Sequence, residues 1–181
     1  MQVKYYVNAV TNHGYSSAKD IVNMHKEVSV MNTFMIDMCS IDIIAKDDEF
    51  SALLKQHNRT GKIRLLTTDV LEEQYRHPKV PRNSRELLSA LIFERVEAEA
   101  FIWGFHWGAK WGDGSHTGMS VDSIMTANRN HIEDALIAVT GVGNADVLVT
   151  EDERLRKKMR SSQSRCEVWN SSQLRQYVLS L

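Results

Sequence analysis

The feature that most constrains the fold is the stretch 131–160, in which a predicted helix, a turn, a short strand and a second helix follow one another. Residues 146–150 form a β-branched apolar run that is long enough for a strand and too short for a helix. Thr150, with Glu153 three residues later, has the pattern of a capping box and predicts a helix start. Asp152 is then expected in the first turn of that helix, just beyond the carboxyl end of the strand. Open α/β sheets build their binding sites at this edge.

The helix before this strand is predicted from apolar residues at helical spacing, and it contains Asp134. Asn130 and Glu133 have the pattern of a capping box at its start. Its end is predicted at residues 141–144 (GVGN), because glycine and asparagine favour the termination of helices.

A second segment repeats the arrangement of a strand followed by an acid. Residues 33–37 are an apolar run that ends on Asp37, and Cys39 and Ser40 lead into an amphipathic stretch. If the two strands are parallel neighbours, Asp37 and Asp152 emerge at the same edge of the sheet. An apolar strand seldom ends on Asp-x-Cys-Ser without a functional reason.

The rest of the chain continues the alternation of strands and helices. Such alternation implies a parallel sheet with helices on both faces. The predicted fold class is therefore α/β, a three-layer α/β/α sandwich with a central parallel sheet. The remaining predicted elements are strands at 63–67 and 166–169, helices at 40–57, 69–77 and 84–107, a Gly/Trp-rich loop at 103–118 and a short C-terminal helix.

These elements resemble the PIN-domain nuclease family over roughly residues 33–170. The resemblance depends on four acids in the family's order. Asp37 ends the first strand, with Cys39 two places on, and Glu73 lies on the helix after the second strand (TTDVLEEQY). Asp134 opens the helix EDALIAV, and Asp152 follows the last buried strand in LVTED. The EDALIAV and LVTED motifs are its most specific part.

The resemblance implies a PIN-like nuclease domain over residues 33–181, with residues 1–32 as an N-terminal extension packed on the core or preceding it. It also implies a ribonuclease that depends on Mg²⁺ or Mn²⁺. The implied catalytic and metal-binding residues are Asp37, Glu73, Asp134 and Asp152, with Thr150 supporting them without contacting the metal.

Clustered carboxylates favour a hard divalent cation. Without compensation, they repel one another and raise one another's pKa values. Mg²⁺ needs only a few carboxylates, because it prefers oxygen ligands and keeps several waters. One ion, or two ions about 4 Å apart, can activate a water and stabilise the leaving oxygen in phosphodiester hydrolysis. The sequence has no evident Ser/His/Asp or Cys/His arrangement, so hydrolysis by metal-bound water is the chemistry that these acids support.

Each acid also has a structural interpretation. Asp134 and Asp152 are expected in first helical turns, where the helix dipole alone favours a negative charge. Either Glu72 or Glu73 can be a solvated helix residue; the spacing from the strand end and the family pattern favour Glu73 as the ligand.

The net charge of −1 argues neither for nor against a nucleic-acid partner. Basic residues nevertheless crowd into the segment directly after Asp152. A solvated helix face explains such a run as readily as a binding site does. Its position beside the candidate metal site favours contacts with nucleic acid, through Arg154, Arg156, Lys157 and Lys158.

Aromatic residues in the Gly/Trp-rich loop offer a second, weaker signal. Trp103, Trp107 and Trp111 are spaced by four, so two or three of them can share a helical face. Such a stripe is more often core or subunit interface than a platform for stacked bases. His106 and His116 have no role assigned by their spacing.

Composition bounds the class of protein. A chain of 181 residues with 43% apolar residues suits one α/β domain. It has no apolar run of the roughly 20 residues that a membrane span needs, and its start lacks the order of a signal peptide. Two cysteines are too few for a disulfide framework. The expected location is the cytoplasm, with no membrane partner.

Other interpretations stay open. A PIN-like module that binds RNA or protein without cutting is the main alternative to the nuclease. A phosphatase on a doubly wound sheet would need a second Asp two residues after Asp37, where Cys39 stands. The expected partners are an RNA substrate, a protein inhibitor of the antitoxin kind and a second copy of the chain. The extension 1–32 and the long segment 84–130 exceed the compact toxin pattern, so a toxin role and an RNA-processing role both stay open.

Overall fold

The computed structural model describes residues 32–100, 115, 120–124, 132–162 and 164–181. The chain divides into two units, Met1–Val30 and Met31–Leu181, and all described residues belong to the second. The extent of the predicted N-terminal extension therefore stays a prediction. The tryptophan stripe, His106, His116 and Asn130 also lie outside the described residues.

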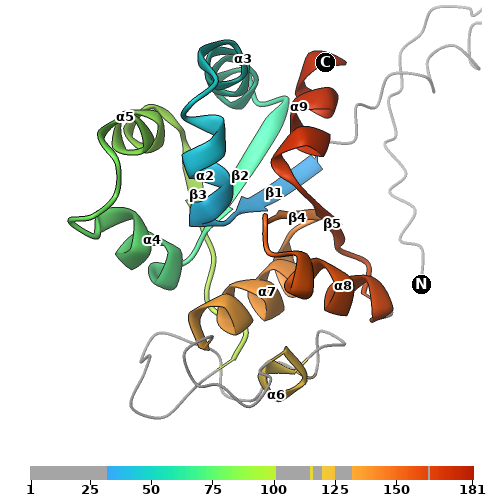
Figure 1. Cartoon of the computed structure of the whole chain (residues 1–181). Coiled ribbons are helices and arrows are strands. Elements are labelled where there is room, and N and C mark those ends of the chain that lie inside the picture. The colour runs from blue at the N-terminus through green and yellow to red at the C-terminus, as the bar shows by residue number, and fades with distance from the viewer. Residues whose placement is uncertain (1–31, 101–114, 116–119, 125–131, 163) are drawn as a thin grey trace, which may run out of the picture. The chain divides into compact units, whose positions relative to one another are not determined.

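The core of the described unit is a parallel sheet of five strands in the order β3-β2-β1-β4-β5 (Figure 1). The strands are β1 (Asn32–Ile36), β2 (Ile63–Thr67), β3 (Phe93–Arg95), β4 (Val147–Val149) and β5 (Glu167–Trp169). In the central register, Phe34 of β1 pairs with Leu65 on one side and with Val147 on the other. Along the chain, β2 and β3 are added on one side of β1, and β4 and β5 are then added on the other side. The order of the strands therefore reverses between β1 and β4.

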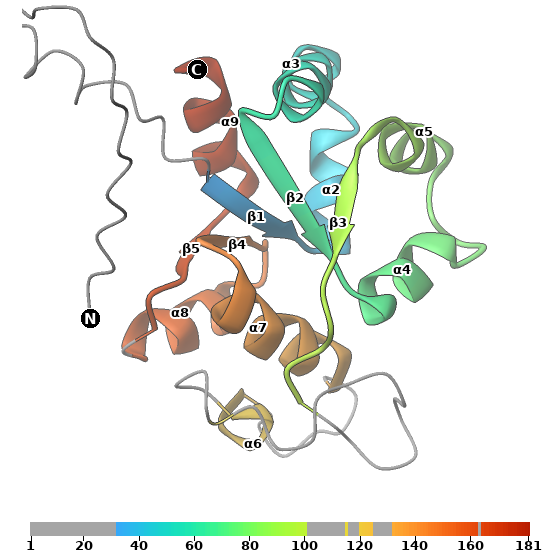
Figure 2. The ribbon, with the colours of Figure 1, turned by 180° about the vertical axis from the view of Figure 1, so that it is seen from behind.

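Helices cover both faces of this sheet (Figures 1 and 2). The first face packs against α2 (Met38–Ile44), α3 (Asp48–Arg59), α5 (Arg82–Ala90) and α9 (Ser171–Leu179). The second face packs against α4 (Asp69–Arg76), α6 (Val121–Ile124), α7 (Ile132–Asn144) and α8 (Glu153–Ser161). This arrangement confirms the predicted three-layer α/β/α sandwich with a parallel sheet. Among the described helices, none is long and apolar enough to cross a lipid bilayer.

Alternation along the strands divides the core between the two faces. Phe34 and Ile36 lie in the core on the first face, whereas Met35 between them lies in the core on the second. All three side chains are completely buried. Full burial of a side chain of this size stabilises the fold by roughly 1.5–3 kcal/mol, so strand β1 is held from both sides.

The single helix predicted at 40–57 is wrong, because the chain forms α2 and α3 with a break between them. Asp47 lies in extended conformation at the break, and its side chain caps α3 by accepting a hydrogen bond from the N–H of Phe50 at 3.0 Å. The Ser51 hydroxyl donates to the carbonyl of Ile44 at 2.7 Å. The break therefore satisfies its own backbone groups, and the apolar periodicity that runs across it did not reveal it.

The long helix predicted at 84–107 is also wrong. Helix α5 ends at Ala90, and Phe93–Arg95 forms the edge strand β3 beside β2 (Figure 2). The Asn58 side chain holds the approach to this strand. Its amide nitrogen donates to the carbonyl oxygens of Ile63 and Ile92 at 3.2 and 3.0 Å, and its oxygen accepts the N–H of Ile92 at 2.7 Å. Tertiary hydrogen bonds thus override the helical preference of this segment.

Helix α7 ends at Asn144, within the end predicted at residues 141–144. Gly141 lies inside the helix, where it packs against strand β4. A Cβ at this position would stand 3.4 Å from Cδ1 of Leu148. The glycine therefore permits close packing of helix on strand instead of ending the helix.

Candidate active site

The predicted site lies at the point where the strand order reverses. Asp37 directly follows β1, and Thr150 and Asp152 follow the neighbouring strand β4. The N–H of Asp37 donates to the carbonyl of Val149 at 3.0 Å, which continues the ladder between the two strands. In doubly wound α/β proteins, ligands bind in the crevice outside such a switch point.

A pocket of about 630 Å³ opens at this edge, and we call it the acidic pocket. The start of α2, helix α4, the turn after α4 and the start of α7 form its walls. Its volume lies within the range of ~300–1,000 Å³ typical of ligand sites. The described residues that line it are Asp37, Met38, Cys39, Asp42, Glu73, Gln74, His77, Lys79, Val80, Pro81, Glu133 and Asp134.

Asp37 is the carboxylate most strongly influenced by its surroundings. Its side chain caps α2 by accepting the N–H of Ser40 at 2.8 Å. Burial raises the pKa of Asp37 above its ordinary value, and the charge of Asp134 adds to the rise. Hydrogen bonds from Thr150 and Ser40 lower the pKa of Asp37 but do not reverse the shift. A desolvated carboxylate near a second acid is where a bound cation has the largest effect.

Thr150 connects the ends of the two strands. Its side chain is completely buried, and its hydroxyl lies close enough to the carboxylate of Asp37 to lower the pKa of that carboxyl. The same oxygen accepts the N–H of Asp152 at 3.1 Å. The predicted capping box of Thr150 and Glu153 is wrong, since Asp152 is the residue that caps α8. The Thr150 hydroxyl instead accepts the N–H of the capping residue Asp152 and lies near the Asp37 carboxylate.

We expect Thr150→Val to lower the free energy of unfolding by about 1–3 kcal/mol, because the backbone N–H of Asp152 loses its partner and the partly buried Asp37 carboxylate loses a polar neighbour. Thr150→Ser keeps the hydroxyl and should lose much less. Urea denaturation of the two variants beside the original protein measures this difference. Equal stability of the valine variant and the original protein would show that the hydroxyl bonds are not important to the fold.

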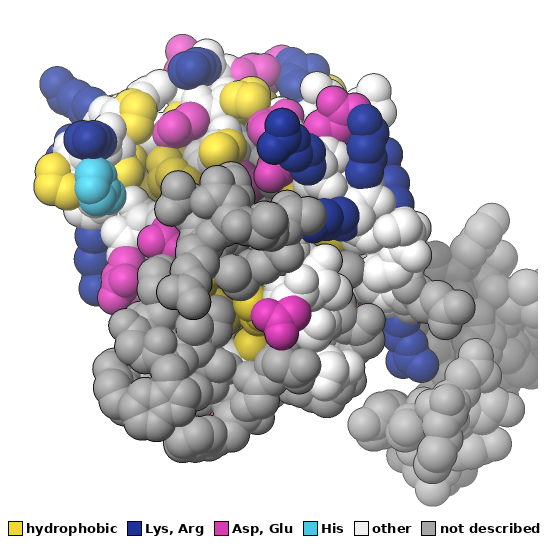
Figure 3. Space-filling model, turned by 60° about the horizontal axis from the view of Figure 1, so that its bottom comes forward, with side chains coloured by type: hydrophobic (Ala, Val, Ile, Leu, Met, Phe, Trp, Pro, Cys, Tyr) yellow, Lys and Arg dark blue, Asp and Glu magenta, His cyan; other side chains and the backbone are white. Residues whose placement is uncertain are grey.

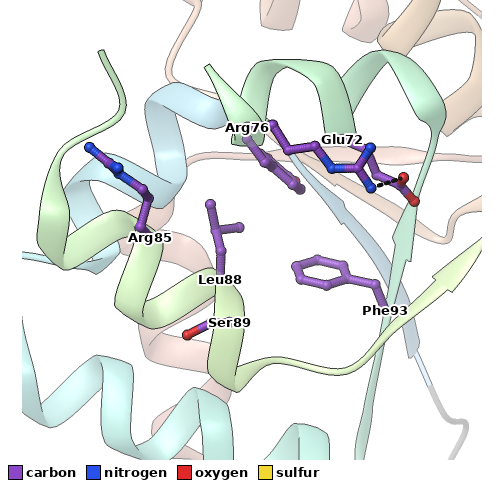
Figure 4. Close-up of a pocket in the computed structure, with 7 residues that line it drawn as sticks. Glu72, Arg76, Arg85, Leu88, Ser89 and Phe93 are labelled. Carbon is purple, nitrogen blue, oxygen red and sulfur yellow. Dashed lines mark hydrogen bonds and ion pairs between the residues drawn. The ribbon is translucent and has the colours of Figure 1, made fainter. Parts of the chain in front are cut away.

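Glu72 and Glu73 point to different sides of α4. Glu73 lines the acidic pocket. Glu72 lines a separate hollow of about 300 Å³ between α4, α5 and β3, where it pairs with Arg76 at 3.1 Å (Figure 4). Of the two glutamates, only Glu73 therefore shares a pocket with Asp37 and Asp134.

The start of α7 supplies two acids to the acidic pocket. Asp134 lies in the first turn of the helix and is partly buried, and its neighbour Glu133 is exposed. Glu133 accepts a hydrogen bond from Nε2 of Gln74 at 2.6 Å, which joins α7 to α4 at the pocket. The predicted cap involving Glu133 needs Asn130, which lies outside the described residues.

Asp152 differs from the other three predicted ligands. It caps α8, where one carboxylate oxygen accepts the N–H groups of Arg154 and Leu155 at 2.8 and 3.2 Å. It is therefore the N-cap and not a first-turn residue, and it is absent from the described lining of the acidic pocket. Its charge still acts at the site. The pKa of the Cys39 thiol is raised by burial first, and then by nearby carboxylates that include Asp37, Asp134 and Asp152.

The carboxylates fit a hard divalent cation in chemical type but do not form a closed cage. Within the described parts of the chain, no three His, Cys, Asp or Glu side chains lie close enough together to hold one metal ion. Mg²⁺ commonly binds proteins through one or two carboxylates and keeps several waters. Asp37 and Asp134, close enough to act on each other's charge, meet that smaller requirement.

Most of the basic side chains predicted to bind nucleic acid have contacts within the chain. Arg156 donates to the carbonyl of Thr150 at 2.6 Å, Lys157 pairs with Glu153 at 2.9 Å, and Lys158 donates to the carbonyl of Ile124 at 2.5 Å. Arg154 is exposed. On the face seen in Figure 3, Lys and Arg side chains of the described residues are interspersed with Asp and Glu.

Sequence reasoning missed several residues of the acidic pocket, among them His77, Lys79 and Glu133. The position of these residues in the sequence was the signal that could have identified them. His77 and Lys79 directly follow the helix after β2, and Pro78 and Pro81 fix the turn that contains them. A turn that leaves this helix at the carboxyl edge of the sheet is well placed to form a wall of the site.

Comparison of the sequence with protein-family models and with curated proteins gave no match. The fold and the acidic pocket therefore define the class: a doubly wound parallel α/β protein with carboxylates gathered at its switch point.

Proposed function

We propose that this protein is a metal-dependent nuclease that hydrolyses RNA phosphodiester bonds at the acidic pocket, with Mg²⁺ or Mn²⁺ as cofactor. One observation carries the proposal. Asp37, Glu73 and Asp134 come from three separate segments of the chain and line one pocket beside the switch point of the sheet. The raised pKa of Asp37 supports it, because a bound cation would relieve the cost of a desolvated carboxylate near a second acid.

In this proposal Asp37 and Asp134 hold the ion directly, Glu73 reaches it from the same pocket through a bound water, and Asp152 adds its charge from the start of α8. When bound, the ion supplies a Lewis acid that lowers the pKa of water and stabilises charge on phosphoryl oxygens. The chain's own contribution is to hold the carboxylates still. The α2 cap fixes Asp37, and the bond between Gln74 and Glu133 joins α7 to α4.

RNA is the proposed substrate, and we further propose a cytoplasmic location. Cys39 and Cys166 are free thiols, as expected where cysteines are kept reduced. A separate inhibitor protein and a second copy of the chain belong to the proposal as partners. Their binding would be measured by co-purification and by light scattering.

The two neighbouring glutamates test the proposal directly. We expect Glu73→Gln to lose most Mn²⁺-dependent cleavage of a single-stranded RNA, about 10-fold to 100-fold or more. Glu72→Gln is the matched control and should keep most of it, because Glu72 pairs with Arg76 in the other hollow. The measurement is the initial rate on end-labelled RNA with Mn²⁺, with Mg²⁺ and with EDTA. Loss in the Glu72 variant alone, or cleavage that persists in EDTA, would refute the assignment.

One observation favours a second candidate, a PIN-like module that binds RNA or protein without cutting. Asp37 and Asp152 both serve as helix caps, and the described residues form no three-ligand metal group. Calorimetric titration with Mn²⁺ distinguishes the two candidates. The nuclease binds the ion with an affinity that Asp134→Asn weakens, whereas a non-catalytic module shows no binding that depends on this residue.

A further inference from the structure

A single short turn supplies the basic side chains of the acidic pocket. Among the described lining residues these are His77 and Lys79, and both belong to residues 77–81, which connect α4 to α5. We call this segment the α4–α5 turn. The carboxylates come from the start of α2, from α4 and from the start of α7. The pocket therefore has acids on three helices and a lysine and a histidine on the turn.

Hydrogen bonds within the turn and from α5 hold the α4–α5 turn in place. The N–H of Val80 donates to the carbonyl of His77 at 3.0 Å, and the Val80 side chain is buried. Arg85 of α5 donates to the carbonyl of Val80 at 3.0 Å and to that of Pro78 at 3.4 Å. In Figure 4 the guanidinium of Arg85 points away from the ring of Phe93. Arg85 therefore holds the backbone of the turn through two hydrogen bonds, and Lys79 projects from this backbone.

The turn also orients the imidazole of His77. Its Nδ1 accepts the N–H of Lys79 at 3.3 Å. A ring nitrogen that accepts a hydrogen bond carries no proton, so in the neutral imidazole the proton lies on Nε2. Nε2 is then a hydrogen-bond donor, and the side chain lines the pocket. Lys79 is exposed and lies two residues further along the same turn.

The basic side chains of α8 are less suited to binding a phosphate. Arg156, Lys157 and Lys158 already contact the chain, so each would have to give up a bond to hold a phosphate. A phosphodiester carries one negative charge that the acids of the pocket repel. The metal ion held by the acids would offset part of this repulsion, and Lys79 adds a positive charge from another wall of the same pocket.

We propose that Lys79 and His77 bind a phosphate of single-stranded RNA in the acidic pocket, Lys79 through its charge and His77 through Nε2–H. The inference rests on the proposed nuclease function and assigns its substrate contacts to the α4–α5 turn instead of α8. The acids and the lysine of the acidic pocket then have separate tasks. The carboxylates hold the metal, and the α4–α5 turn holds the nucleic-acid backbone.

Fluorescence anisotropy of a short labelled oligouridine RNA, measured with Mn²⁺ over a series of salt concentrations, tests the inference. The Glu73→Gln background slows consumption of the RNA. We expect Lys79→Gln to weaken binding and to lower the slope of log affinity against log salt by about 0.7, the value for one phosphate contact on a single strand. We expect His77→Leu to weaken binding with an unchanged slope, because the substitution removes a hydrogen bond and not an ion pair. His77→Gln, which keeps an N–H donor, should restore part of the affinity.

Lys157→Gln and Arg154→Gln are the matched controls on α8, and both should leave affinity and slope unchanged. An unchanged slope in Lys79→Gln overturns the inference, as does a slope that falls only in the α8 variants. These failures are distinct from failure of the nuclease. If the original protein cleaves RNA with Mn²⁺ while Lys79→Gln binds normally, only the inference is wrong. If the original protein neither binds nor cleaves RNA, the proposed function fails and the inference fails with it.

Discussion

Asp37→Asn is expected to abolish Mn²⁺-dependent RNA cleavage, at least about 100-fold, and to raise the thermal midpoint of the metal-free protein at neutral pH. Asparagine is as good an N-cap as aspartate, so its side-chain oxygen can still accept the N–H of Ser40. What the substitution removes is a desolvated negative charge. The activity falls because a ligand is lost, and the stability rises because the fold no longer has to bury that charge.

The sign of the pH dependence follows from the raised pKa of Asp37. The folded protein holds this proton more tightly than the unfolded chain does. The stability that protonation contributes is therefore fully present below the unfolded pKa and is lost as the pH rises through the folded pKa. The gain from Asp37→Asn should be largest near neutral pH and should vanish as the pH falls below the unfolded pKa of Asp37.

Metal and a second substitution complete this test. Saturating Mn²⁺ should stabilise the original protein, by about 2.7 kcal/mol at 100 times the dissociation constant, and should stabilise Asp37→Asn much less. Asp37→Ala also loses the cap and should be less stable than Asp37→Asn by about 1 kcal/mol. Thermal melts with chelator and with Mn²⁺ measure both effects. A destabilised asparagine variant with an unchanged response to metal would refute the metal site.

The largest expected loss of stability comes from Asn58→Ala, about 2–5 kcal/mol. Asn58 is buried, and its truncation leaves the N–H and carbonyl of Ile92 and the carbonyl of Ile63 without these bonds. A buried group that loses its partner, as the carbonyl of Ile63 does, costs about 1–3 kcal/mol, and the two part-buried groups of Ile92 cost less. Because these bonds fix the approach to β3, the edge strand should loosen before the rest of the sheet. Hydrogen exchange at the amides of Ile92 and β3 measures this directly.

Two controls distinguish lost hydrogen bonds from a simple loss of side-chain volume. Asn58→Asp keeps the acceptor for the N–H of Ile92 but replaces the donor with oxygen facing two carbonyls, so it should destabilise the protein at least as much as alanine does. Asn83→Ala loses the bond to the carbonyl of Ala45 and the bond from the N–H of Ser84, and it should cost about 1 kcal/mol. Undiminished protection of β3 in Asn58→Ala would show that pairing with β2 is enough to hold the strand.

Local pattern in the sequence was sufficient for much of the fold. The strand predicted at 63–67 coincides with β2, and the apolar runs before Asp37 and Thr150 became the adjacent strands β1 and β4. These predictions succeed because burial of a strand on both faces requires a continuous apolar run. The position of Asp37 at the sheet edge follows from the same run, since the first polar residue after a buried strand must lie where the strand leaves the core.

Only the tertiary structure decided how the acids and bases are distributed around the site. Apolar periodicity alone could not show which of Glu72 and Glu73 lies in the acidic pocket, because that depends on which side of α4 meets the start of α7. Nor could it show that Lys157 and Lys158 are engaged while Lys79 lines the acidic pocket.

The sequence by itself determined the alternation of strands and helices and the order of the four acids along the chain, because both are recorded in local apolar periods and in strand ends. The tertiary structure decided where periodic segments break and which neighbours meet. Asn58 and Ile92 are 34 residues apart, yet their hydrogen bonds turn a segment with helical preference into the approach to a strand. Partners at that separation are set by the order of strands in the sheet, and no local pattern records that order.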